Sequence, residues 1–276
     1  MKMTICCTPR GVRFTDLIRK ANAKTIDRER KAIKSLRFKL RAAVRKHLKH
    51  VALNIARQVV HARMLLGKAE ASDDDLNRIL DSLNLDWSAL ESDTTPIIQK
   101  ILEDSGAVAL DQIDAVTERA LKLVNERAVE YAKERSADLV TNISESTRGM
   151  LRSDVSDALE SGASNDQLAA TLEENYAFSS SRAEVIARTE TAYADVQGNL
   201  KAYEASGVVD QLEWMTGAGC CELCDQLDGD VIDLGETFDT EDGPITAPPY
   251  HPNCRCDVKP ITAKNNDLGN AEENSD

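Results

Sequence analysis

The first quarter of the chain is a long stretch with almost no helix breaker, and it limits the possible folds more than any other feature. From about Phe14 to Leu66 this stretch places apolar residues at a regular spacing, at Ile33, Leu36, Leu40, Val44, Leu48, Val51, Ile55, Val59, Ala62 and Leu66. Nine steps cover 33 positions, a mean of 3.67 residues, close to the roughly 3.6 of a helical turn. The pattern predicts one long amphipathic helix ending near Gly67, whose apolar stripe needs a partner in the chain's own helices or in another subunit.

Further helices are predicted between this stretch and Gly207, because Gly and Pro are sparse and helix-forming residues dominate. We expect them over residues 72–83, 96–104, 109–160, 164–174 and 181–205. Their start signals are Ser72 before three aspartates, Thr95 before Pro96, and the capping boxes Ser164–Gln167 and Ser181–Glu184.

The composition changes after Gly207, where Gly, Cys, Asp and Pro become frequent. Short apolar segments predict strands near 208–214, 231–234 and 256–261 in a small β-rich module. The expected fold class is therefore mainly α: a long N-terminal helix and a helical body, followed by a small β-rich, Cys/His-containing C-terminal module (α+β). Residues 263–276 are polar and acidic, and we expect them to be disordered.

Charge divides the chain into two parts. Residues 1–70 carry 19 Lys and Arg against 4 Asp and Glu, a net charge of +15, whereas the remainder carries 15 against 43, a net charge of −28. The basic end could contact nucleic acid or an acidic protein surface, or it could pair with the chain's own acidic part. The candidate DNA or partner contacts are Arg37, Lys39, Arg41, Arg45, Lys46 and Lys49. The histidines of the same helix, His47, His50 and His61, are expected to be surface groups.

Five of the seven cysteines fall within 37 residues, from Cys220 to Cys256. The start of the chain has no apolar stretch long enough for a secretory signal, so we expect a soluble, unexported protein in a reducing compartment. Clustered cysteines in that setting indicate metal ligands before disulfides. Cys6 and Cys7 receive no role.

Two ligand pairs stand in this window, Cys221-x-x-Cys224 and His251-x-x-Cys254. Two such pairs from distant segments can complete a tetrahedron around one ion, so we predict a structural Zn²⁺ site. The alternate ligands are Cys220, which competes upstream, and Cys256, which could be the fourth ligand instead. A disulfide formed after release from the cell and buried free thiols are the alternatives to a metal.

Two enzymatic functions are alternatives to a structural metal site. Cys254 or Cys256 beside His251 could be a nucleophile with its base, but no third group to orient the histidine is evident. A metal-dependent nuclease would need histidine and carboxylates on a ββα element, and its downstream helix is missing. Because full Cys/His coordination leaves no open position for catalysis, we expect no enzyme.

Several motifs occur in a specific order in the C-terminal half. They are SRAEVIARTETAYADVQGNLKAYEASGV, the tryptophan strand LEWMT, CELCDQLDGDVIDL and APPYHPNCRCDVKPI. Together they closely resemble the phage Mu F-like, or SPP1 gp7-like, head morphogenesis domain, over roughly residues 120–262. The family motif positions map onto the helical residues Arg188, Thr189 and Glu190, and onto Arg255 beside the Cys/His positions.

The resemblance implies a minor capsid protein of a tailed bacteriophage, with a structural role in head assembly at the portal vertex and in DNA packaging or delivery. It implies portal, capsid or scaffold proteins as partners, packaged DNA as a further one, and a place inside the virion head after assembly in the host cytoplasm. No apolar run approaches the roughly 18 residues that span a bilayer, so no membrane is expected. The alternative function is sequence-nonspecific DNA binding through the basic helix.

The domain organisation expected from these features has four parts. Residues 1–70 form the basic helix and residues 71–119 form linking helices. Residues 120–262 form the Mu F-like domain, with helices over 120–206 and the β/Cys-His module over 208–262. Residues 263–276 form the acidic tail.

Overall fold

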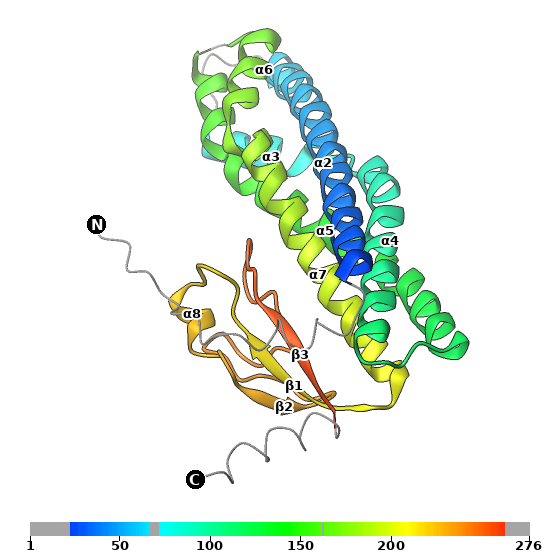
Figure 1. Cartoon of the computed structure of the whole chain (residues 1–276). Helices are drawn as coiled ribbons and strands as arrows, with labels where there is room; N and C mark the ends of the chain where they lie inside the picture. The colour runs from blue at the N-terminus through cyan, green and yellow to red at the C-terminus, as the bar shows by residue number, and fades with distance from the viewer. Residues whose placement is uncertain (1–22, 67–71, 162, 263–276) are drawn as a thin grey trace. The chain divides into compact units, whose positions relative to one another are not determined.

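The computed structural model describes residues 23–66, 72–161 and 163–262 (Figure 1). The helices are α2 (Ala23–Leu66), α3 (Asp73–Ser82), α4 (Ser88–Gln112), α5 (Glu118–Ser161), α6 (Asn165–Glu174), the short 3-10 helix η1 (Tyr176–Phe178), α7 (Ser180–Ser206) and α8 (Glu222–Asp225). The strands are β1 (Val209–Met215), β2 (Val231–Asp233) and β3 (Asp257–Thr262). The predicted fold class is confirmed. The predicted helix start near Phe14, Cys6, Cys7 and the acidic tail lie outside the described residues.

The chain divides into two compact units. The helical unit consists of Phe38–Ile97 and Lys133–Ala187. The mixed unit consists, among the described residues, of 23–37, 98–132 and 188–262, and it contains the small sheet. Each unit has its own hydrophobic core.

The core of the helical unit buries the predicted apolar stripe of α2. The stripe residues that join this core are Val44, Leu48, Val51, Ile55 and Val59, all at most 2% exposed. Their partners are apolar side chains from the unit's parts of α3, α4, α5, α6 and α7. Because each buried aliphatic side chain contributes roughly 1.5–3 kcal/mol, the stripe is a major source of stability. The chain's own helices therefore supply the partner that the pattern requires.

Two of the predicted helix starts are confirmed in detail. The Ser72 hydroxyl accepts a bond from the Asp75 backbone N–H at 3.2 Å, and the Asp75 carboxylate accepts one from the Ser72 N–H at 3.1 Å. Ser164 and Gln167 make the same reciprocal pair at the start of α6. Each box satisfies backbone donors that the first helical turn leaves without a partner.

The predicted start at Thr95-Pro96 is wrong, because α4 begins at Ser88 and continues through Pro96. Leu90 and Thr94 are fully buried, so the turns before the proline are held by the core of the helical unit. The hydroxyl of Thr95 donates to the Glu91 carbonyl at 2.8 Å and caps no helix start. Tertiary burial here outweighs a local signal.

The predicted continuous helix over 109–160 is also wrong, since α4 ends at Gln112 and α5 begins at Glu118. Asp114 adopts a left-handed conformation (φ 55°), which Asp tolerates better than most residues and which commonly follows a helix end. Thr117 then accepts a bond from the Ala120 N–H at 3.1 Å and caps α5.

The Ser181–Glu184 capping box is a third wrong prediction. Helix α7 begins at Ser180, and its cap is Ser179, whose hydroxyl accepts from the Arg182 N–H at 3.1 Å. The Glu184 carboxylate instead lies 3.2 Å from the Arg41 guanidinium within the helical unit.

The mixed unit contains a three-stranded antiparallel sheet in the order β2-β1-β3. Trp214 of β1 is fully buried and meets Phe238 edge to face, with ring centroids 5.1 Å apart. Gly198 of α7 allows a close approach to α4, because a Cβ there would lie 2.5 Å from the Leu102 carbonyl oxygen. None of the helices within the described ranges is long and apolar enough to cross a membrane.

Candidate metal centre in the C-terminal module

The upstream ligand pair sits on a single helical turn. Cys221 is the N-cap residue of α8, and Cys224 is the third residue of that helix. The Asp225 N–H donates to the Cys221 carbonyl at 3.0 Å and closes the turn. A C-x-x-C segment wound in this way places both sulfurs within reach of one ion.

The downstream pair sits on a tight turn of its own. The Cys254 N–H donates to the His251 carbonyl at 3.1 Å. Asn253 takes the left-handed conformation (φ 65°), which is several-fold more frequent for Asn than for most residues. Through this turn the His251 ring and the Cys254 sulfur both reach the Cys224 sulfur.

The two pairs lie next to one another in the structure. The Nε2 atom of His251 lies 3.2 Å from the Cys221 sulfur and 3.3 Å from the Cys224 sulfur. The sulfurs of Cys224 and Cys254 are 3.8 Å apart. Zinc bond lengths of about 2.3 Å to sulfur and 2.0–2.1 Å to nitrogen give tetrahedral edges of roughly 3.8 Å between sulfurs and 3.6 Å between sulfur and nitrogen. The sulfur–sulfur distance fits that geometry, and the two others are a few tenths of an ångström short.

The His251 ring is oriented as a metal ligand would be. Its Nδ1 atom lies 2.9 Å from the Pro252 carbonyl oxygen. An N–H at Nδ1 that donates to this carbonyl leaves the lone pair of Nε2 facing the sulfurs of Cys221 and Cys224. A carbonyl that holds the far nitrogen in this way is the usual second partner of a zinc-bound histidine.

Five residues gather at the centre in two overlapping groups. Cys221, Cys224 and His251 form one group, and Cys224, Cys254 and Cys256 form the other, with the ligand atoms of each within 4.8 Å of one another. Cys224 belongs to both groups, and Cys224, Cys254 and Cys256 are all buried. Cys220 belongs to neither group, and its sulfur lies 3.8 Å from the Asp225 carboxylate.

The thiols differ in acidity. The hydrogen bond from the Cys256 thiol lowers the pKa of Cys254 to about 5, whereas burial and then the negative charge of Cys254 raise the pKa of Cys224 to about 12. Burial lowers the pKa of His251, but its bond to Pro252 and the neighbouring thiolates raise it overall. The donor set thus offers one ready thiolate, and an ion would displace protons from the other groups.

These residues fit a structural metal ion better than a catalytic one. The set consists of thiols and one imidazole, which suit zinc, and its two groups of three ligands share Cys224. An ion coordinated by four protein groups keeps no open position for a substrate or a reactive water.

Helix α7 supports the loop that carries His251 and Cys254. The Arg188 guanidinium donates to the Asn253 side-chain oxygen at 2.7 Å, and the Asn253 N–H donates to the Thr189 hydroxyl at 2.9 Å. Glu190 is buried, at 5% exposure. Asn253, which the sequence reasoning missed, therefore links the helical motif to the Cys/His loop.

A second contact lies on the other side of the same loop. The Arg255 guanidinium donates to the Ala218 carbonyl at 3.4 Å. The backbones of Gly217 and Arg255 approach so closely that a Cβ on Gly217 would lie 2.3 Å from the Arg255 carbonyl oxygen. Glycine at this position lets the upstream and downstream segments come together.

The predicted contact residues of the basic helix all lie on α2, and four of them are exposed: Lys39, Arg45, Lys46 and Lys49. Arg37 and Arg41 are partly buried. His47 is not the predicted surface group, because it is only 6% exposed and its Nε2 lies 2.9 Å from the Asp93 carboxylate. His50 and His61 are exposed, as predicted.

Comparison with known proteins identifies one family. Residues 150–259 match the family model described as Phage Mu protein F like protein. No curated protein and no solved structure matches the chain. The matched segment includes the Arg188–Glu190 motif and both ligand pairs, and the family is a structural phage family. Over residues 150–259 the chain is similar to the phage Mu F-like proteins, which confirms the resemblance predicted from its motifs and indicates a phage head-related protein.

Proposed function

We propose that this chain is a minor head protein of a tailed bacteriophage. It acts structurally in head assembly at the portal vertex and in the packaging or delivery of DNA. The observation that carries the proposal is the family match over residues 150–259, which includes the Cys/His centre and the α7 motif that braces it. Its partners are the portal protein and capsid or scaffold proteins, and it resides inside the head near the portal.

The C-terminal module contributes rigidity to this role through a structural Zn²⁺. The proposed ligands are Cys221, Cys224, His251 and Cys254, with Cys256 as the alternate fourth ligand. The ligand-atom distances of 3.2, 3.3 and 3.8 Å support this set. Short strands and loops bury little apolar surface, so a metal would stabilise the module more than it would stabilise the helical unit.

The test is the presence of the chain in assembling heads. An affinity-tagged full-length chain is supplied to cells that produce its phage, and proheads and virions are separated on density gradients. We expect the chain in both particles, in few copies per head, and cross-linked to the portal protein. Its absence from proheads and virions at every salt concentration would contradict the proposal.

A matched pair of variants links the module to assembly. Cys224→Ser removes the sulfur shared by both ligand groups, whereas Cys220→Ser removes a neighbouring thiol that belongs to neither. We expect incorporation into proheads to fall for Cys224→Ser and to stay unchanged for Cys220→Ser. Equal incorporation of both variants would show that assembly does not depend on the Cys/His centre of the module.

A further inference from the structure

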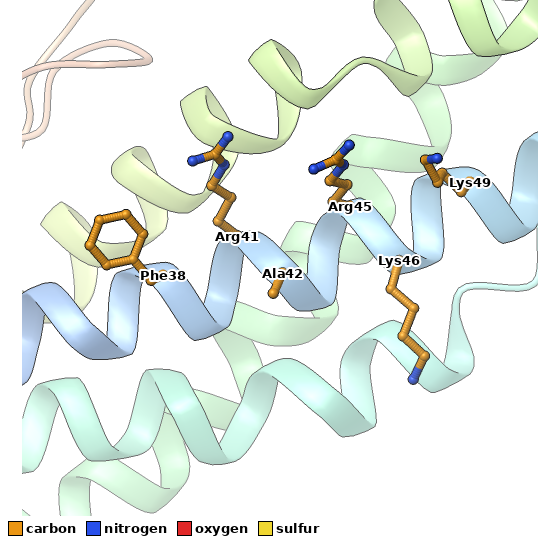
Figure 2. A pocket seen from close by; sticks show the side chains of 6 residues that line it. All are labelled: Phe38, Arg41, Ala42, Arg45, Lys46 and Lys49. Atoms are coloured by element: carbon orange, nitrogen blue, oxygen red, sulfur yellow. The ribbon is translucent and has the colours of Figure 1, made fainter.

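A basic concave surface lies on helix α2, within the helical unit. Its volume is about 530 Å³, and it is lined by Phe38, Arg41, Ala42, Arg45, Lys46 and Lys49. Figure 2 shows the side chains of Arg41, Arg45 and Lys49 rising from one side of the helix, while Lys46 points to the other side. We call these six residues the basic pocket.

Two of the four cations in the basic pocket already have acidic partners. The Arg41 guanidinium pairs with Glu184 at 3.2 Å, and the Lys46 ammonium pairs with Asp93 at 3.1 Å. Arg45 and Lys49 are exposed, and no carboxylate of the described part of the chain lies within ion-pair distance of either. The pocket therefore keeps two positive charges after its internal pairs are counted.

The cations on one side of the pocket are evenly spaced. Arg41, Arg45 and Lys49 are separated by four residues each, so at a rise of about 1.5 Å per residue the row is roughly 12 Å long. Each strand of duplex DNA carries one phosphate charge per roughly 3.4 Å of axis, so the row would lie along about three to four phosphates of one strand. The core-facing residues Val44, Leu48 and Val51 lie roughly 60–120° around the helix from Arg45, so the row borders the buried face of α2.

We infer that the basic pocket binds the phosphate backbone of duplex DNA without reading its sequence. The setting of this inference, packaged DNA inside a head, rests on the proposed function. An acidic protein surface is a weaker candidate, because the centres of protein interfaces are depleted in Lys, whereas DNA-binding surfaces are strongly positive. Phe38, 49% exposed, is the sole large apolar side chain among the six lining residues, too little for an apolar interface core.

The experiment measures binding of the purified full-length chain to a fluorescent duplex of mixed sequence over a series of salt concentrations. Each phosphate contact contributes about −0.9 to the slope of log K against log salt. The double variant Arg45→Gln/Lys49→Gln should therefore bind more weakly at low salt, with a slope about 1.8 shallower than that of the unchanged chain. A duplex of different sequence should give the same values.

The matched control is Arg57→Gln/Lys133→Gln, which removes the same charge from exposed positions outside the basic pocket. At about 100° per residue, Arg57 lies roughly 80–120° around α2 from Arg45 and Lys49, and Lys133 lies on α5. The control should keep the affinity and slope of the unchanged chain. Equal losses in the two double variants would show that overall charge drives binding, and would overturn the inference.

Two further outcomes would also overturn it. One is no binding of duplex by the unchanged chain at about 50 mM salt, a condition that favours phosphate contacts. The other is equal binding of polyglutamate, which would make an acidic protein surface the occupant. Prohead incorporation of Arg45→Gln/Lys49→Gln is measured separately. The DNA-binding inference can therefore be contradicted without contradicting the head-protein proposal, and the head-protein proposal can be contradicted without contradicting DNA binding.

Discussion

The two units of this chain are stabilised by different kinds of core. The hydrophobic core of the helical unit consists mostly of aliphatic side chains, which come from amphipathic helices and include Leu48 and Ile55. The core of the mixed unit includes the three thiols of Cys224, Cys254 and Cys256 beside Trp214. One of its strands, β2, has only three residues. The difference indicates that long helices can bury enough apolar surface alone, whereas a short sheet with long loops would gain most from a chemical cross-link such as a bound metal.

The largest expected effect follows from removing the proposed Zn²⁺. Chelation should unfold the C-terminal module and leave the helical unit folded, because apparent zinc-binding energies of about 10–16 kcal/mol in small sites are folding energies. The two tryptophans of the chain report on the two cores separately, since Trp87 lies in the helical unit and Trp214 in the mixed unit. After chelation the emission of Trp214 should shift to the red, measured in Trp87→Phe.

The companion measurement uses Trp214→Phe, in which Trp87 alone emits. Its emission and the helical circular dichroism should change little on chelation. If both tryptophans shifted together, the two cores would depend on one another and the contrast between them would fail.

A smaller but still large effect is expected from a buried cation in the helical unit. The Arg182 guanidinium is 5% exposed and donates to the Ala177 carbonyl at 2.6 Å and to the Thr147 and Ser146 hydroxyls at 2.9 and 2.6 Å. Arg182→Ala leaves the buried Ala177 carbonyl and Thr147 hydroxyl without this donor, so we expect a loss of about 3–5 kcal/mol in unfolding free energy. Urea unfolding followed at Trp87 measures it.

Arg152→Ala is the control for this change, because Arg152 is exposed and bonds to the exposed Asn77. Its loss should stay below about 1 kcal/mol. Zinc content should be unchanged in both variants. Loss of metal from Arg182→Ala would show that the helical core governs the module.

The smallest expected effect is a pH dependence in the helical unit. Hydrogen bonds from His47 and then Lys46 lower the pKa of Asp93. A carboxylate whose pKa is lowered on folding stabilises the protein above its unfolded pKa, and this contribution is lost as the pH falls through the folded value. Asp93→Asn should therefore cost up to about 1 kcal/mol near pH 7, since Asp93 is partly exposed, and less below about pH 4.

Asp138→Asn serves as the reference, because Asp138 is an exposed carboxylate of the same unit. Unfolding free energies are compared from pH 3 to pH 7. A penalty for Asp93→Asn that stayed constant over this range would exclude the ionised pair as its source.

The sequence predicts the regular parts of the helical unit well. The stripe on α2 and the caps at Ser72 and Ser164 depend on residues close together in the chain, which periodicity and capping rules describe. The helix through Pro96 and the burial of His47 depend on residues far away, such as Asp93, 46 positions from His47. A local pattern contains no information about such partners.

The candidate metal centre, too, is predicted from the sequence only in part. The spacing of the two ligand pairs predicts that they face one ion, and the structure brings Cys221, Cys224 and His251 together. Spacing alone does not decide whether Cys220 or Cys221 is the upstream ligand. In the structure Cys221 is the N-cap residue of α8 and groups with Cys224 and His251, whereas Cys220 does not. The hydrogen bonds that link Arg188 and Thr189 with Asn253 span more than 60 residues, so helical periodicity could not identify them.

Metal analysis of the purified chain, paired with thiol counting, tests the central contrast between the two units most directly. We predict about one zinc per chain with protected thiols, retention of the zinc in Cys220→Ser, and its loss in Cys224→Ser. A chain that folds without metal and leaves the thiols of Cys221, Cys224 and Cys254 reactive would contradict the account.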